Sequence, residues 1–121
     1  MRTGHRYKSY TGETGVSYQY YFDALRPIVR PEGQGAGSDY TFVVTAGQHP
    51  PFTLKIFVAA RALEEWAQTH GRELGPNEQY AAAKMRLFRA FDEEERLVET
   101  RLDSVVDETN IEDLLSTLGL V

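Results

Sequence analysis

The chain has 121 residues, 41% of them hydrophobic, and a formal net charge of −5. This length fits one domain with its own hydrophobic core, and the absence of cysteine excludes disulfide frameworks, thiolate zinc sites and cysteine nucleophiles. The charge is uneven: residues 1–63 carry seven Lys/Arg against four Asp/Glu, whereas residues 64–121 carry six against fourteen.

The N-terminal part is polar and is followed by an alternating pattern. Residues 1–15 are rich in glycine, serine and threonine, so we expect a mobile arm or a loosely paired edge there and a single domain over residues 16–121. Residues 16–23 alternate, with Tyr18, Tyr20 and Phe22 on one face, which predicts a strand.

A glycine-rich segment and a hairpin follow. Two prolines, Pro27 and Pro31, predict that the strand pattern stops, and residues 30–39 read as a flexible loop. Residues 40–46 and 52–58 both alternate between apolar and polar side chains, and a Gly/Pro turn separates them. This arrangement predicts a β-hairpin.

The period then changes to that of a helix. Apolar residues recur at helical spacing from Ala59 to His70, and Gly71 is a typical left-handed cap. Pro76 suits the first position of a second helix, whose inner face comprises Tyr80, Ala83, Leu87, Phe88 and Phe91.

The last third of the chain is harder to interpret. Residues 97–106 keep helical spacing, but a short strand is the alternative. Thr109 and Glu112 have the spacing of a capping box before a short final helix closed by Gly119. Strands followed by helices favour an α+β fold, with a small antiparallel sheet of about three strands and two or three helices on one face.

The sequence contains no recognisable catalytic, cofactor or metal motif. The glycine-rich loop lacks the Gly-Lys-Ser/Thr ending of a phosphate-binding loop, and no Gly-x-Ser-x-Gly occurs. The histidines, His5, His49 and His70, have no metal-ligand spacing. We therefore expect no cofactor and no metal, and no set of residues supports an enzyme.

The absence of a long apolar run predicts that the protein has no membrane partner. No segment approaches the roughly 18 apolar residues of a membrane helix, and the first residues lack the apolar core of a signal peptide. Together with the absence of cysteine, this predicts a cytoplasmic location.

The N-terminal half combines aromatic and basic residues. Its aromatic strand residues are most simply explained as one buried face of a sheet. The alternative is a single-stranded nucleic-acid binder, in which bases stack on exposed rings and basic side chains follow the phosphates. The basic residues are Arg2, Arg6, Lys8, Arg26, Arg30 and Lys55.

The C-terminal part carries an acidic surface that is interrupted by the apolar residues Val98, Leu102, Val105 and Val106. Such a surface could dock a protein partner or a second copy of the chain. We therefore predict a non-enzymatic protein-binding or regulatory module, with nucleic-acid binding as the alternative. The seven candidate partner-binding residues are Tyr21, Arg26, Arg30, Lys55, Val98, Leu102 and Val105.

Overall fold

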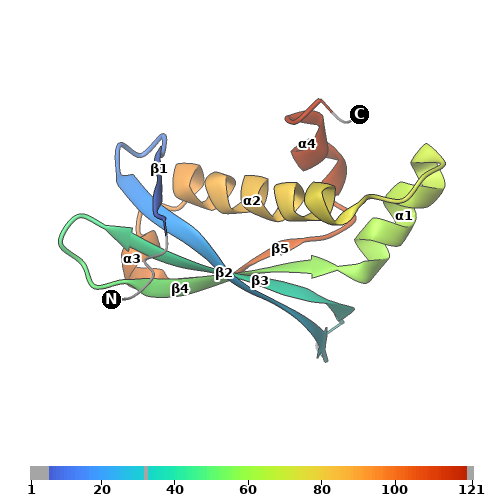
Figure 1. The fold of residues 1–121 in the computed structure, drawn as a ribbon, viewed down its shortest axis with the longest axis horizontal. Helices are drawn as coiled ribbons and strands as arrows, with labels where there is room; N and C mark the ends of the chain where they lie inside the picture. Colours follow the sequence, from blue (N-terminus) through green and yellow to red (C-terminus); the bar gives the residue numbers. More distant parts are fainter. Residues whose placement is uncertain (1–5, 32, 120–121) are drawn as a thin grey trace.

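A five-stranded sheet organises the chain in the computed structural model, which describes residues 6–31 and 33–119 (Figure 1). In chain order the strands are β1 (Lys8–Thr11), β2 (Ser17–Arg30), β3 (Gly35–Ala46), β4 (Phe52–Ala59) and β5 (Ser104–Val106). The helices are α1 (Ala60–His70), α2 (Pro76–Glu93), α3 (Leu97–Thr100) and α4 (Ile111–Ser116).

The sheet is mixed and strongly curved. Strands β1 to β4 form an antiparallel meander, and β5 returns beside β4 in the parallel direction after α1, α2 and α3. Helix α2 lies across the concave face (Figure 1). The predicted α+β character is confirmed, but the prediction of a small antiparallel sheet of about three strands with two or three helices is wrong.

The two additional strands are short and lie at opposite edges of the sheet. Strand β1 occupies residues 8–11 of the expected arm, and it pairs with residues 17–20 of β2. Residues 1–5, which include Arg2 and His5, lie outside the described residues. Strands of four and three residues carry too little alternation to be recognised alone, because their extended shape depends on the neighbouring strand.

Strand β2 is longer than its proline content predicts. It continues through Pro27 to Arg30, and β3 begins at Gly35, so a tight turn replaces most of the expected flexible loop. A proline removes one N–H donor, and a strand tolerates this loss where that side of its backbone has no partner strand. This part of β2 is such an edge.

The two main helices were predicted correctly. The cap residue Gly71 has a φ of 72°, in the left-handed region that glycine adopts readily. Pro76 is the first residue of α2, whose buried positions include Ala83, Leu87 and Phe91. No helix within the described ranges 6–31 and 33–119 is both long enough and apolar enough to cross a membrane.

Two of the aromatic residues near the N-terminus, Tyr18 and Tyr20, fill the core between β2 and α2. The Tyr18 and Phe91 rings stack with centroids 4.2 Å apart, and both side chains are fully buried. Tyr20 is also buried and packs edge-on against Phe88 at 5.6 Å. The alternating aromatic side chains of β2 are therefore buried in the core only as far as residue 20.

The segment over residues 97–106 contains both of the elements that the sequence left open. Helix α3 takes its first four residues, and β5 takes its last three. Arg101 separates them with a φ of 51°, a left-handed conformation that ends the helix. Leu97 and Val106 are both buried, so each element contributes to the core.

The predicted capping box of the final helix is wrong. The N-cap is Asn110, and its side chain connects the segments before the helix, accepting from the Asp107 N–H and donating to the Val105 carbonyl. Glu112 instead bonds His70, with 2.9 Å between Oε1 and Nε2. The Glu112 carboxylate therefore contacts α1 and does not bond the backbone at the start of its own helix, as a capping box would require.

Glu78 forms a true capping arrangement at the start of α2. Its carboxylate accepts from the Gly75 N–H at 2.9 Å and from both terminal nitrogens of Arg72, at 2.9 and 2.8 Å. The bonds from Arg72, followed by the bond from Gly75, lower the pKa of Glu78 from 4.5 to about 2. Because the folded-state pKa is the lower one, the stabilisation is present above about pH 4.5 and is lost as the pH falls toward 2.

We expect Glu78→Gln to lower the free energy of unfolding at about pH 7, with a smaller difference from the wild type near pH 2. Urea denaturation followed by the fluorescence of the buried Trp66 measures both values. The control is Glu73→Gln, which replaces an exposed carboxylate in the same connection. If Glu78→Gln lowers the free energy of unfolding by the same amount at both pH values, the assigned role of the ionised Glu78 is wrong.

Candidate protein-binding surface

The outer edge of β2 is paired over only part of its length. Strand β1 covers residues 17–20, and no other described strand borders residues 21–30 on that side. In Figure 1 the far end of the β2–β3 hairpin extends away from α2. The second half of β2 is therefore accessible along its edge and is only partly covered by helices.

This open half carries four exposed apolar side chains, which we call the β2 strip. They are Phe22, Leu25, Ile28 and Val29, with exposed fractions of 38%, 53%, 37% and 70%. Phe22, Leu25 and Val29 lie on one face of β2 and Ile28 on the other. Exposed large hydrophobic residues grouped on a small chain are typical of an interaction site. Sequence reasoning missed Leu25, Ile28 and Val29 because the prolines were expected to end the strand pattern, and it grouped the exposed Phe22 with the buried Tyr18 and Tyr20.

The pairing with β3 shows which way the strip faces. A register shift between Phe22 and Ala24 changes the alternation, so that Leu25 lies opposite the buried Tyr40. Directly paired residues share one face of a sheet, so Leu25 and Val29 lie on the concave side. Ile28 lies opposite Gly37 on the convex side.

Two features make the open edge a poor site for adding another strand. The irregularity after Phe22 interrupts the regular spacing of backbone groups, and Pro27 has no N–H to donate. Both are known ways in which proteins protect sheet edges from unwanted pairing. We therefore expect a partner to contact the side chains of the strip more than the backbone of β2.

A shallow apolar groove lies between the sheet and the helices. Two adjoining cavities, of about 190 and 250 Å³, share Ala60, Leu63 and Gln79 as lining residues. Tyr40 also lines the smaller cavity, and its strand neighbour Leu25 belongs to the strip. The groove therefore lies one strand away from the strip, and it extends to the start of α2.

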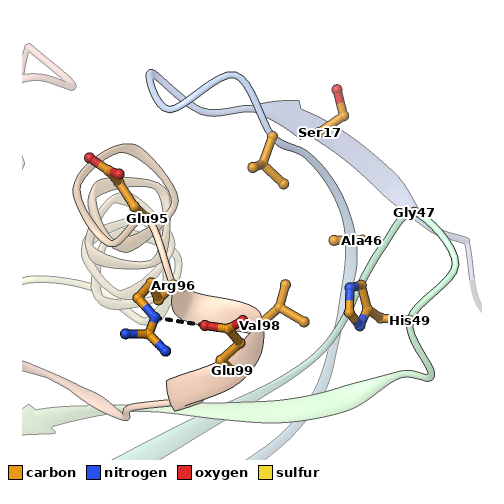
Figure 2. A pocket seen from close by; sticks show the side chains of 9 residues that line it. Ser17, Ala46, Gly47, His49, Glu95, Arg96, Val98 and Glu99 are labelled. Atoms are coloured by element: carbon orange, nitrogen blue, oxygen red, sulfur yellow. Dashed lines mark hydrogen bonds and ion pairs between the residues drawn. The ribbon is translucent and has the colours of Figure 1, made fainter.

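The largest cavity, of about 770 Å³, lies elsewhere (Figure 2). Its polar side chains are exposed, and the Arg96 Nε to Glu99 Oε1 distance of 2.7 Å ties two of them together. His49 approaches from the β3–β4 turn (Figure 2). The lining residues are Val16, Ser17, Ala46, Gly47, His49, Glu95, Arg96, Val98 and Glu99. This set does not combine a buried nucleophile with a base.

The structure places five of the seven candidate residues on the convex face and separates the other two. Across β2, β3, β4 and β5 the register aligns Arg26, Asp39, Phe57 and Val105. The other three convex-face candidates are Tyr21, Arg30 and Lys55. Val98 instead lines the largest cavity, and Leu102 is 59% exposed in the connection between α3 and β5.

Two of the convex-face candidates have contacts within the protein. Arg30 Nη2 lies 2.7 Å from Oδ1 of the buried Asp39, and its guanidinium covers the Phe57 ring at 4.8 Å. Tyr21 packs edge-on against Tyr7, with ring centroids 5.0 Å apart. These contacts stabilise the convex face and make both side chains less available to a partner. Arg26 and Lys55 are exposed.

The close approach of Phe57 explains why glycine occupies position 37. A Cβ at Gly37 would lie 2.4 Å from the Val58 carbonyl oxygen and 2.6 Å from the Phe57 ring. Because the ring is fully buried against this backbone, the convex face has a small apolar centre of its own beneath Arg30.

Comparison of the chain with protein-family models, with curated protein sequences and with solved structures finds no match in any of the three. Among the described residues, no group of three or more His, Asp or Glu side chains is placed to hold a metal ion.

Proposed function

We propose that this chain is a small non-enzymatic binding module that contacts a protein partner through the β2 strip. The exposure of Phe22, Leu25, Ile28 and Val29 on the unpaired half of β2 is the observation that supports this function. Burying large apolar side chains is the main favourable term in most protein association. The cytoplasm remains the proposed location, because a chain without cysteine fits a reducing compartment.

The shape of the surface favours a protein segment over a nucleic acid. Beyond Phe22 the strip is aliphatic, and aliphatic side chains offer no flat ring on which a base can stack. On the convex face, where nucleic-acid binding was the alternative, Arg30 is paired with Asp39 and Tyr21 packs against Tyr7. The contacts of the strip suit the apolar side chains of a partner protein better.

Selection from a random peptide library against the wild-type protein tests this function. We expect the selected peptides to bind the double variant Leu25→Ser/Val29→Ser about tenfold or more weakly, because two apolar contacts are lost. Fluorescence anisotropy with labelled copies of the peptides measures this difference. Leu102→Ser is the matched control, because it replaces another exposed leucine far along the chain.

Sedimentation velocity over a range of protein concentrations tests whether a second copy is the partner. If the wild type dimerises and the double variant does not, the strip is a self-association surface. Equal binding of selected peptides to the wild type and the double variant would contradict the proposed function. So would a monomeric wild type from which no peptide can be selected.

A further inference from the structure

Two lysines lie on either side of Tyr20 at the point where the open half of β2 begins. Lys8 is directly opposite Tyr20 in the β1–β2 pairing, so both are on the concave face. Lys84 reaches the same place from α2, with its Nζ 6.0 Å from the centre of the Tyr20 ring and 5.7 Å from that of Phe88. Segments distant in sequence thus bring two ammonium groups to one aromatic site.

No ion pair within residues 6–31 and 33–119 includes Lys8 or Lys84. Partial burial, followed by the charge of Lys8, lowers the pKa of Lys84 below its usual 10.5. Neighbouring like charges without an anion are unfavourable, and a bound anion would relieve that repulsion.

The lysines are continuous with the β2 strip. Phe22 follows Tyr20 by two residues on the same face of the strand, and its ring centroid lies 5.2 Å from that of Tyr80. Leu25 and Val29 then continue along β2 away from the lysines. A bound segment following this strand would therefore meet positive charge first and aliphatic side chains next.

We infer that the partner is an acidic–apolar protein segment, whose carboxylate binds between Lys8 and Lys84 while its apolar side chains cover Phe22, Leu25 and Val29. This inference rests on the proposed function and specifies the chemistry of the partner. The ammonium groups of the partly buried Lys84 and the exposed Lys8 provide charge-assisted hydrogen bonds to the carboxylate. The strip then provides the apolar contact.

Two labelled, end-blocked peptides test the inference. One has a pair of glutamates followed by alternating leucine and serine, and the other has glutamines in place of the glutamates. We expect the glutamate peptide to bind the wild type about tenfold more tightly in fluorescence anisotropy, with a smaller difference at high salt. Lys8→Gln and Lys84→Gln should remove this preference. Lys55→Gln, on the convex face, should keep it.

Acetylation followed by mass spectrometry gives a second measurement. The lysines of the chain are Lys8, Lys55 and Lys84, so each can be followed in one digest. The glutamate peptide should slow the acetylation of Lys8 and Lys84 and leave that of Lys55 unchanged. Circular dichroism of the lysine variants confirms that a loss of binding does not reflect unfolding.

The possible outcomes separate the inference from the proposed function. If both peptides bind equally and binding still needs Leu25 and Val29, the carboxylate site is wrong and the strip remains a protein-binding surface. If the double variant Leu25→Ser/Val29→Ser binds as tightly as the wild type, the role of the strip is wrong. Binding of neither peptide contradicts the inference, and the selection from the random library then decides the proposed function. Stronger protection of the lysines by single-stranded DNA than by the glutamate peptide would overturn the carboxylate assignment.

Discussion

Phe91→Ala is expected to lower the free energy of unfolding by about 3–5 kcal/mol, the usual cost of removing a fully buried aromatic side chain. Phe91 has no exposed surface, stacks on Tyr18 at 4.2 Å and lies within 6.1 Å of Tyr20 between ring centroids. Its loss would leave a cavity between α2 and β2, where the strand cannot collapse without losing its pairing with β3. Urea denaturation followed by Trp66 fluorescence measures the change.

The control for this prediction is Leu102→Ala. Leu102 is also a large apolar residue, but it is 59% exposed, so we expect a change within about 0.5 kcal/mol. If Phe91→Ala costs less than about 1 kcal/mol, the ring is not the centre of the α2–β2 contact.

Asp39→Ala is the second substitution for which we expect a large effect, a loss of about 2–3 kcal/mol of unfolding free energy. The Asp39 side chain is 6% exposed, and its partner Arg30 is 26% exposed. Removing the carboxylate leaves a partly buried guanidinium over Phe57 without its anion. Because Arg30 keeps some contact with water, the cost should be below that of an entirely buried charge.

A double-mutant cycle tests the coupling between these two residues. Replacing both Arg30 and Asp39 with leucine should cost less than Asp39→Ala alone, because no charge is then left unpaired. Arg26→Ala is the matched control: Arg26 faces Asp39 across the β2–β3 pairing, but the ion pair is made by Arg30. An equal cost for Arg26→Ala and Asp39→Ala would show that the ion pair does not stabilise the convex face.

The parts of the fold that could be predicted are those with a long local pattern. The hairpin of β3 and β4 alternates over most of its length and has a Gly/Pro turn between its strands. The helices α1 and α2 have apolar residues at helical spacing and recognisable ends at Gly71 and Pro76. Such patterns depend on neighbouring residues in the chain, so they can be recognised without knowing the rest of the fold.

The candidate site was only partly predictable, for a related reason. Arg30 was selected as a candidate partner-binding residue, but its ion pair with Asp39 depends on how β2 and β3 are aligned. Lys84 was not selected, because only the packing of α2 on the sheet brings it beside Lys8 and Tyr20. Its role in binding a carboxylate remains a prediction.

The sequence by itself determined the α+β composition, the two main helices and the central hairpin, because each is encoded by side-chain periodicity within one segment. Only the tertiary structure decided that residues 8–11 and 104–106 become strands, because hydrogen bonds from β2 and β4 hold them extended. It also decided that β2 continues through Pro27, because this stretch lies at an edge where the missing N–H has no partner strand. The exposed strip follows from that position at the edge.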